Sequence, residues 1–189
     1  MKHLFLAAAL AATATTGFAA DKYILDSSHS QVVFNYNHLG FSTTYGMFSG
    51  FEGEIVFDQE DPTQSSVTVS MPTKSMFTGW EKRTAHFLSG DFFGATDESL
   101  ISFASTGIEI TGDNTAKITG DLTLNDVTKS VVLDAVLNKV GPNPLSKTDW
   151  AGFDATTTLK RSEFGLGAFA PAVSDEVEVS ISVEAAKAE

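Results

Sequence analysis

Apolar and polar side chains alternate along almost the whole chain, and the alternation is clearest between residues 31 and 38. In that segment bulky, mainly aromatic residues share one parity and mainly amide residues share the other: Val32, Phe34, Tyr36 and His38 against Gln31, Val33, Asn35 and Asn37. Successive side chains of a β-strand point to opposite faces, so one face of this strand collects rings. The pattern predicts a closed antiparallel barrel with an apolar interior, and it indicates a protein that holds an apolar molecule rather than cleaving one.

The same alternation recurs at residues 51–58, 66–71, 101–110, 118–124, 131–137, 153–159 and 176–184. A change of parity at Gly107 predicts a β-bulge, and Asn125-Asp126 and residues 112–114 predict tight turns. Eight or nine strands, each with one apolar face, predict an all-β domain formed by a single extended antiparallel barrel of eight strands. A β-sandwich is the alternative, and glycines inside several strands favour the barrel because strongly bent strands need them.

Two segments interrupt the strand pattern. Residues 79–89 favour a helix, because Trp80, Arg83 and Phe87 recur at helical spacing. Residues 162–171 carry Phe164 and Phe169 between glycines and read as an irregular loop. We expect one short helix and this loop to border the entrance to the barrel.

The first nineteen residues have the pattern of a secretory signal peptide. A basic start at Lys2 and His3 precedes an apolar run over residues 4–14, and small residues follow at Gly17 and Ala19. The run is too short to span a bilayer, which disfavours the alternative of a membrane anchor. We therefore expect cleavage after Ala19 and a single domain over residues 20–189. The absence of cysteine fits a bacterial periplasmic protein, with secretion as the alternative location.

The formal charge of −12 removes nucleic acid from the expected partners, because no basic phosphate-binding surface is available. The chain contains two arginines, Arg83 and Arg161, and both lie in aromatic-rich segments. Each arginine either pairs with a nearby carboxylate such as Glu81 or Glu163, or receives an anionic group. The sequence leaves both alternatives open.

No catalytic motif is present, so we expect neither enzymatic activity nor catalytic residues. Three histidines beyond the leader, His29, His38 and His86, could form an open zinc site, which makes a metal-dependent protein one alternative. His29 and His38 are nine residues apart, however, and would face opposite sides of an unbroken strand. The pattern therefore predicts no metal site and no cofactor, and it favours histidines that make polar contacts.

The chain resembles the YceI-like family of exported bacterial proteins over essentially its whole length after the leader. The resemblance is carried by Tyr23-x-x-Asp26-x-x-His29-Ser30, Gly46-x-Phe48-x-x-Phe51-x-Gly53, Arg83-x-x-His86-x-x-Ser89-x-Asp91-Phe92-Phe93 and Arg161-Ser162-x-Phe164-Gly165. It implies a lipocalin-like barrel that binds polyisoprenoids, isoprenoid quinones or fatty amides, and a role tied to stress.

From the inward aromatic face and this resemblance together, we expect a long-chain lipid ligand held inside the barrel. The residues expected to contact its apolar tail are Phe34, Tyr36, Phe48, Phe51, Phe92, Phe93 and Phe103. Those expected near its head group are His38, Arg83, His86 and Arg161. Transient membrane contact and a homodimer stay open as further partners. A filled barrel that acts through its surface as an adaptor or inhibitor is the remaining alternative.

Overall fold

The computed structural model describes residues 20–189, so the expected signal peptide over residues 1–19 lies outside the described residues. The described chain forms ten β-strands and one α-helix, with three short 3-10 turns. The strands are β1 Asp21–Leu25, β2 Gln31–His38, β3 Ser42–Phe48, β4 Glu52–Phe57, β5 Ser66–Pro72, β6 Leu100–Gly112, β7 Thr115–Leu124, β8 Val127–Pro142, β9 Asp149–Lys160 and β10 Glu176–Lys187. The helix α1 spans Glu81–Leu88, inside the segment that the sequence predicts as helical.

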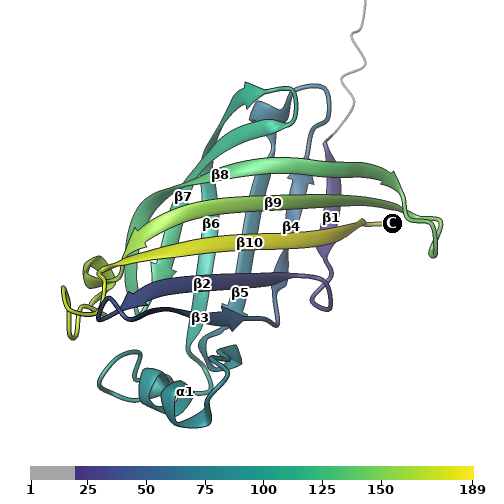
Figure 1. Cartoon of the computed structure of the whole chain (residues 1–189). Coiled ribbons are helices and arrows are strands. Elements are labelled where there is room, and N and C mark those ends of the chain that lie inside the picture. The colour runs from purple at the N-terminus through teal and green to yellow at the C-terminus, as the bar shows by residue number, and fades with distance from the viewer. Residues whose placement is uncertain (1–19) are drawn as a thin grey trace, which may run out of the picture.

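The ten strands form an eight-position antiparallel barrel, as the sequence predicts (Figure 1). Strands β4 to β10 are neighbours in chain order. Strand β1 closes the ring, because it pairs with β4 along one edge and with β10 along the other. One edge of β10 pairs with β2 over residues 178–182 and with β1 over residues 185–187. Strands β1 and β2 therefore share one barrel position, and β3 and β4 share the next.

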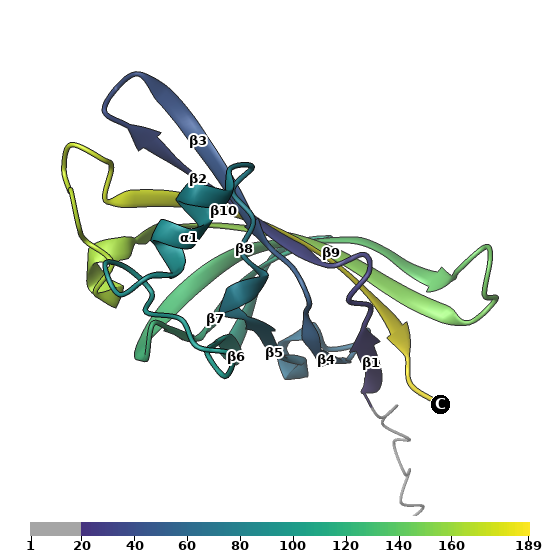
Figure 2. The ribbon, with the colours of Figure 1, turned by 90° about the horizontal axis from the view of Figure 1, so that it is seen from below.

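Local chemistry explains why these two positions are split. The Asp26 side chain accepts a hydrogen bond from the backbone N–H of Ser28 at 2.9 Å, which turns the chain between β1 and β2. Gly50, with φ of 72°, lies between β3 and β4 and turns the chain there in the left-handed region that glycine adopts readily. The β2–β3 hairpin consequently extends beyond the ring of strands (Figure 2).

The predicted bulge and turns are confirmed. The pairing of β6 with β7 shifts register between Ser105 and Gly107, and this shift re-aims the later half of β6. Asn125 and Asp126 both have positive φ, of 52° and 59°, as the tight turn between β7 and β8 requires. Within residues 20–189, no helix combines the length and apolar character needed to cross a bilayer.

Side chains fill one end of the barrel, which we call the packed end. It lies where β1 meets β4, the start of β9 and the end of β10. Tyr23 lies edge-on to Phe57 with 6.5 Å between ring centroids, and Phe57 lies edge-on to Phe153 at 5.5 Å. Ala151 and Ala185, paired across β9 and β10, are fully buried beside them.

Candidate functional site

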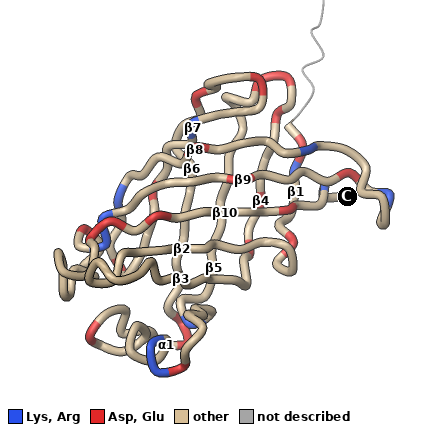
Figure 3. Tube along the Cα trace, viewed as in Figure 1, with Lys and Arg blue, Asp and Glu red and all other residues tan. Residues whose placement is uncertain are grey.

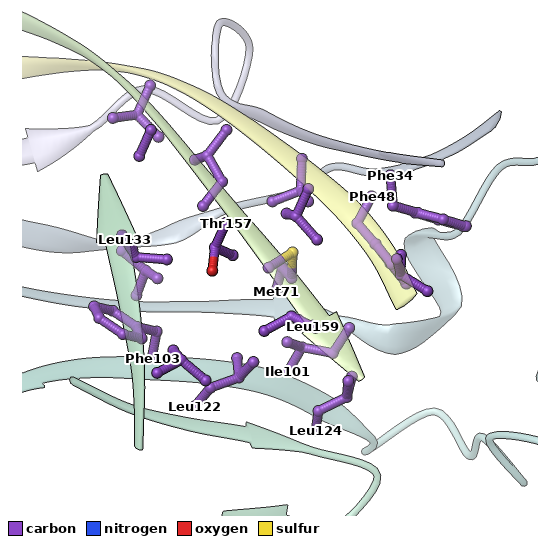
Figure 4. Close-up of a pocket in the computed structure, with 18 of the residues that line it drawn as sticks. Phe34, Phe48, Met71, Ile101, Phe103, Leu122, Leu124, Leu133, Thr157 and Leu159 are labelled. Atoms are coloured by element: carbon purple, nitrogen blue, oxygen red, sulfur yellow. The ribbon is translucent and has the colours of Figure 1, made fainter. Parts of the chain in front are cut away.

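A cavity of about 1070 Å³ runs through the barrel, and Phe57 and Phe153 of the packed end form part of its wall. Small-molecule sites occupy about 300–1,000 Å³, so this cavity is slightly larger than that range. Its wall is almost entirely apolar. Figure 4 shows side chains from several strands, among them Met71, Leu133 and Leu159, pointing into one shared space.

The side chains of β2 alternate between the cavity and the outer face, as the sequence predicts. Val32, Phe34, Tyr36 and His38 all line the cavity, and the four residues of the other parity do not. The alternative of a filled barrel therefore loses its premise, since the interior is hollow.

All seven residues expected to contact a lipid tail line this cavity: Phe34, Tyr36, Phe48, Phe51, Phe92, Phe93 and Phe103. Some of their rings also touch one another. Phe48 lies 5.5 Å from Phe34 and 6.3 Å from Phe93 between ring centroids. Their contact with a ligand stays a prediction.

The predicted tail contacts are all aromatic, so they leave out the aliphatic residues of the cavity wall. Strands β6 to β9 contribute Ile101, Leu122, Leu124, Leu133 and Leu159, among others. The signal that could have found them is the same period-two parity that identifies the strands. Side chains on that parity face inward as a set, so aliphatic and aromatic residues belong to one surface.

Small residues keep the middle of the cavity wide. Ala116, Ala135 and Ala155 are paired in register across β7, β8 and β9, and all three line the cavity. Gly120 serves a related purpose, because a Cβ there would lie 2.3 Å from the ring of Phe103 and 2.6 Å from the carbonyl oxygen of Ala104. The ring of Phe103 can therefore lie flat on the barrel wall.

Four segments surround the opposite end, which we call the mouth: α1, the turn over residues 89–94, the loop over residues 161–175 and the tip of the β2–β3 hairpin. Ring contacts join them, since Phe87 lies 6.0 Å from Tyr36 and 5.2 Å from Phe92, and Phe92 lies 6.2 Å from Phe169. Trp80 and Phe169 line the cavity and are also exposed to solvent. This arrangement supports the expected entrance.

Arg161 holds the loop of the mouth through its guanidinium group. Its Nε donates to the carbonyl of Ser174 at 2.8 Å, and its terminal nitrogens donate to Ala168 at 2.8 Å, to Val173 at 2.9 Å and to Leu166. Burial lowers the pKa of this guanidinium below its ordinary value. Arg161 also lines the cavity, but most of its donors are used by backbone carbonyls.

Arg83 is much less engaged than Arg161. One terminal nitrogen donates to the carbonyl of Thr78, and its buried Nε has no hydrogen-bond partner. Among the described residues neither arginine forms an ion pair, so the alternative in which each pairs with Glu81 or Glu163 is not the one that the structure adopts. Arg83 therefore keeps donor capacity at the mouth that Arg161 lacks.

The three histidines belong to different places. His38 and His86 line the cavity, and His86 also lies 3.2 Å from a carboxylate oxygen of Asp91. His29 lies outside the barrel interior, with its Nδ1 2.7 Å from Asp26. Within residues 20–189, no group of three or more histidine, aspartate or glutamate side chains converges to hold a metal ion. The alternative of a three-histidine metal site therefore has no geometric basis.

Ser28, His29 and Asp26 adjoin one another without forming a catalytic triad. Both the Ser28 hydroxyl, at 3.0 Å, and the Asp26 carboxylate, at 2.7 Å, approach the same ring nitrogen, Nδ1. A triad requires the nucleophile and the acid on opposite nitrogens of the imidazole. This cluster caps the turn between β1 and β2.

A family model that describes a YceI-like domain matches residues 23–185. The chain belongs to the YceI-like family. A UPF0312 protein of Ectopseudomonas mendocina is 40% identical over 168 residues, which cover 88% of this chain and 87% of that protein. The resemblance inferred from the motifs is thereby confirmed.

Solved structures share the fold. BcnA of Burkholderia cenocepacia superposes with a TM-score of 0.76 at 23% identity, covering 85% of this chain and 98% of that one. A polyisoprenoid binding domain from Saccharophagus degradans, implicated in plant cell wall breakdown, superposes with a TM-score of 0.67 at 14% identity. It covers 90% of this chain and 100% of that domain. At these identities the likeness concerns the barrel itself.

Proposed function

We propose that this protein binds a long-chain apolar lipid in the barrel and carries it through the periplasm. The observation that carries the proposal is the continuous apolar cavity of about 1070 Å³. The name of the Saccharophagus degradans domain, which binds a polyisoprenoid on the same fold, supports the ligand class. The candidates are a polyisoprenoid, an isoprenoid quinone or a fatty amide.

The expected binding free energies of the tail and the head of such a lipid differ, so the two parts have separate roles. Each ~100 Å² of tail removed from water contributes about 2.5 kcal/mol before the costs of association. An exposed ion pair at the head contributes about 0–1 kcal/mol. The apolar wall therefore sets affinity, and the polar residues set orientation.

The charges that line the cavity indicate which way the lipid lies. Lys82, Arg83 and His86 lie on α1 at the mouth, whereas Asp113 lies in the turn that follows β6. Strand β6 starts near α1 and runs for 13 residues, roughly 40 Å of chain, before that turn. We place a polar or anionic head group at α1, with the guanidinium of Arg83, which lines the cavity, as its principal donor. His38 is a second donor, and Arg161 acts mainly by holding the loop.

The proposed role is binding without catalysis. Within residues 20–189, the one hydrogen bond between a hydroxyl and a histidine ring joins Ser28 to His29, and neither residue lines the cavity. Export rests on residues 1–19, whose pattern is that of a signal peptide. A contribution to stress tolerance would follow if the cavity stores or protects a membrane lipid.

The first test identifies a ligand in the protein produced from the full-length sequence. Native mass spectrometry of the purified protein should show one bound lipid, and organic extraction should release a polyprenyl, quinone or acyl compound. Protein that is empty and also refuses added lipids of all three classes would overturn the carrier proposal.

A matched pair of variants tests whether the cavity is the site. Ala135→Trp places a large side chain in the cavity, whereas Val136→Trp places the same side chain on the outer face of β8. Ala135→Trp should shorten the longest lipid that binds, and Val136→Trp should not. Phe34→Asp with Phe103→Asp should abolish uptake in a barrel that circular dichroism shows to be folded. Equal uptake by all variants would remove the cavity as the site.

A further inference from the structure

Two segments that meet at the mouth carry no charged residue, although the chain as a whole has a net charge of −12. Asp, Glu, Lys and Arg are all absent from Ser27 to Phe51 and again from Phe164 to Ser174. Figure 3 shows the first of these segments as an unbroken tan tube over β2 and β3. The two segments are joined, since Ser174 N–H donates to the carbonyl of Asn37 at 3.0 Å. Charge is therefore excluded from one edge of the mouth.

Large apolar side chains project from these segments. Phe41 is 89% exposed, Phe169 is 65% exposed and Leu39 is 49% exposed. Leu39 and Phe169 also line the cavity, so the apolar surface continues from the interior to the outside. We call Leu39, Phe41 and Phe169 the apolar lip.

Backbone geometry supplies an independent indication that these side chains serve a purpose. Five residues other than glycine adopt positive φ in the described chain: Leu39, Asn125, Asp126, Lys147 and Phe169. Three of them are polar residues at turns, but Leu39 at 56° and Phe169 at 64° are bulky and apolar. Side chains of this kind are unfavourable in the left-handed region, which glycine and asparagine occupy with less strain. Strain that persists at exposed positions is typical of functional surfaces.

We propose that the apolar lip inserts into a lipid bilayer and seals the mouth against it. The inference rests on the proposed carrier function, because a lipid that leaves the cavity through water would expose its tail at a cost proportional to area. A protruding hairpin tip fits between lipid head groups. A stable protein partner would instead need roughly 800 Å² of matched surface with a polar rim.

The charges set the conditions for docking. An acidic protein is repelled by an anionic surface over about 10 Å at 0.1 M salt, so only its uncharged edge can approach closely. The lip should therefore bind neutral phosphatidylcholine vesicles most tightly. Binding should survive high salt, because it depends on burying apolar area.

The test compares two equally exposed residues at opposite ends of the molecule. Phe41 projects from the β2–β3 tip and Leu145, 91% exposed, from the β8–β9 tip (Figure 1). In flotation with phosphatidylcholine vesicles, Phe41→Ser should lower the partition coefficient about tenfold or more. Leu145→Ser should leave it unchanged. Both variants are produced from the full-length sequence, so a difference in vesicle binding between them cannot come from their N-terminal residues.

A second readout separates this inference from the carrier function. Lipid delivered from dilute detergent should bind Phe41→Ser as well as it binds the unsubstituted protein, while transfer from vesicles slows. Leu39→Asn should raise the melting temperature by about 2 °C by relieving backbone strain, and should still weaken vesicle binding.

Three results would overturn the docking proposal. The first is flotation of Phe41→Ser equal to that of the unsubstituted protein. The second is a solution dimer that Phe41→Ser converts to monomer, which would assign the lip to a second copy. The third is loss of detergent-delivered binding in Phe41→Ser, which would make the lip part of the cavity. A protein that binds vesicles through the lip but takes up no lipid would contradict the carrier function alone.

Discussion

The packed end and the mouth of this barrel are built from the same kinds of aromatic residues, used in opposite ways. At the packed end Tyr23, Phe57 and Phe153 interlock edge to face, and alanines complete the filling. At the mouth Tyr36 and Phe92 each touch Phe87, Phe92 also touches His86 and Phe169, and all of these residues border the cavity. What differs is burial, since Tyr23 is 1% exposed and Phe169 is 65% exposed, and an exposed ring has fewer neighbouring atoms to attract.

The difference shows how one barrel can be stable and hollow. Packing stabilises the closed side, where β1 joins β10 and Tyr23, Ala151 and Ala185 are almost fully buried. At the mouth, hydrogen bonds from the guanidinium of Arg161 to backbone carbonyls hold the loop in place. The fold of the mouth therefore depends less on contacts between its aromatic rings, and these rings can contact a ligand.

Truncating one aromatic ring at each end should sharpen the contrast most. Tyr23→Ala, at a residue only 1% exposed, should lower the free energy of unfolding by about 3–5 kcal/mol. Phe92→Ala at the half-buried mouth should cost about 1 kcal/mol and weaken lipid binding more than stability. Urea unfolding and lipid titration measure the two effects. Equal losses of stability would show that both ends are packed alike.

The two arginines offer the next comparison. Arg161→Met leaves several loop carbonyls without their donors, and should lower the free energy of unfolding by about 2–4 kcal/mol. Arg83→Met removes a single hydrogen bond and should change stability by less than about 1 kcal/mol. It should instead reduce the preference for lipids with an anionic head group over uncharged analogues of equal tail length. A head-group preference that depends on Arg161 alone would contradict these assignments.

Glycines beneath the aromatic rings allow a smaller test inside the cavity. Gly120→Ala meets both the ring of Phe103 and the backbone oxygen of Ala104, and should cost about 1–3 kcal/mol. Gly46→Ala meets only the ring of Phe34, which can turn away into the cavity, so it should cost less. Both variants should reduce the volume open to lipid. A larger loss of stability in Gly46→Ala than in Gly120→Ala would contradict this prediction. It would show that the residues around β7 adjust to an added methyl group more easily than those around β3.

The smallest effect concerns pH at the turn between β1 and β2. The hydrogen bond between the two side chains lowers the pKa of Asp26 and raises the pKa of His29. The contribution of His29 to stability is complete below its ordinary pKa of 6.5 and is lost as the pH rises through its higher folded value. The contribution of Asp26 is complete above its ordinary pKa of 3.8 and is lost as the pH falls through its lower folded value.

The pair should therefore stabilise the fold most between these two ordinary values. His29→Gln should flatten the fall in melting temperature that thermal scans record above pH 6.5. An unchanged pH profile would show that the pair contributes nothing measurable. Lipid binding should be the same in both proteins, because His29 lies outside the cavity.

The pattern of the sequence by itself determined eight of the ten strands, their inward faces and the family, and it missed β1 and β3. Val32 to His38 could be assigned to the interior because side-chain parity is a local property of a strand. The bulge at Gly107 and the turn at Asn125-Asp126 could be predicted for the same reason, since each depends on a few adjacent residues.

Only the tertiary structure decided what depends on distant parts of the chain. The sharing of one edge of β10 by β1 and β2 follows from closing the ring, which local patterns do not encode. The sequence left open whether Arg83 and Arg161 pair with carboxylates, and folding decided against it. Loop carbonyls brought close by folding accept most of the donors of Arg161, whereas Arg83 makes a single hydrogen bond. Whether the interior is filled or hollow depends on how the alanines of β7, β8 and β9 align in register across three strands.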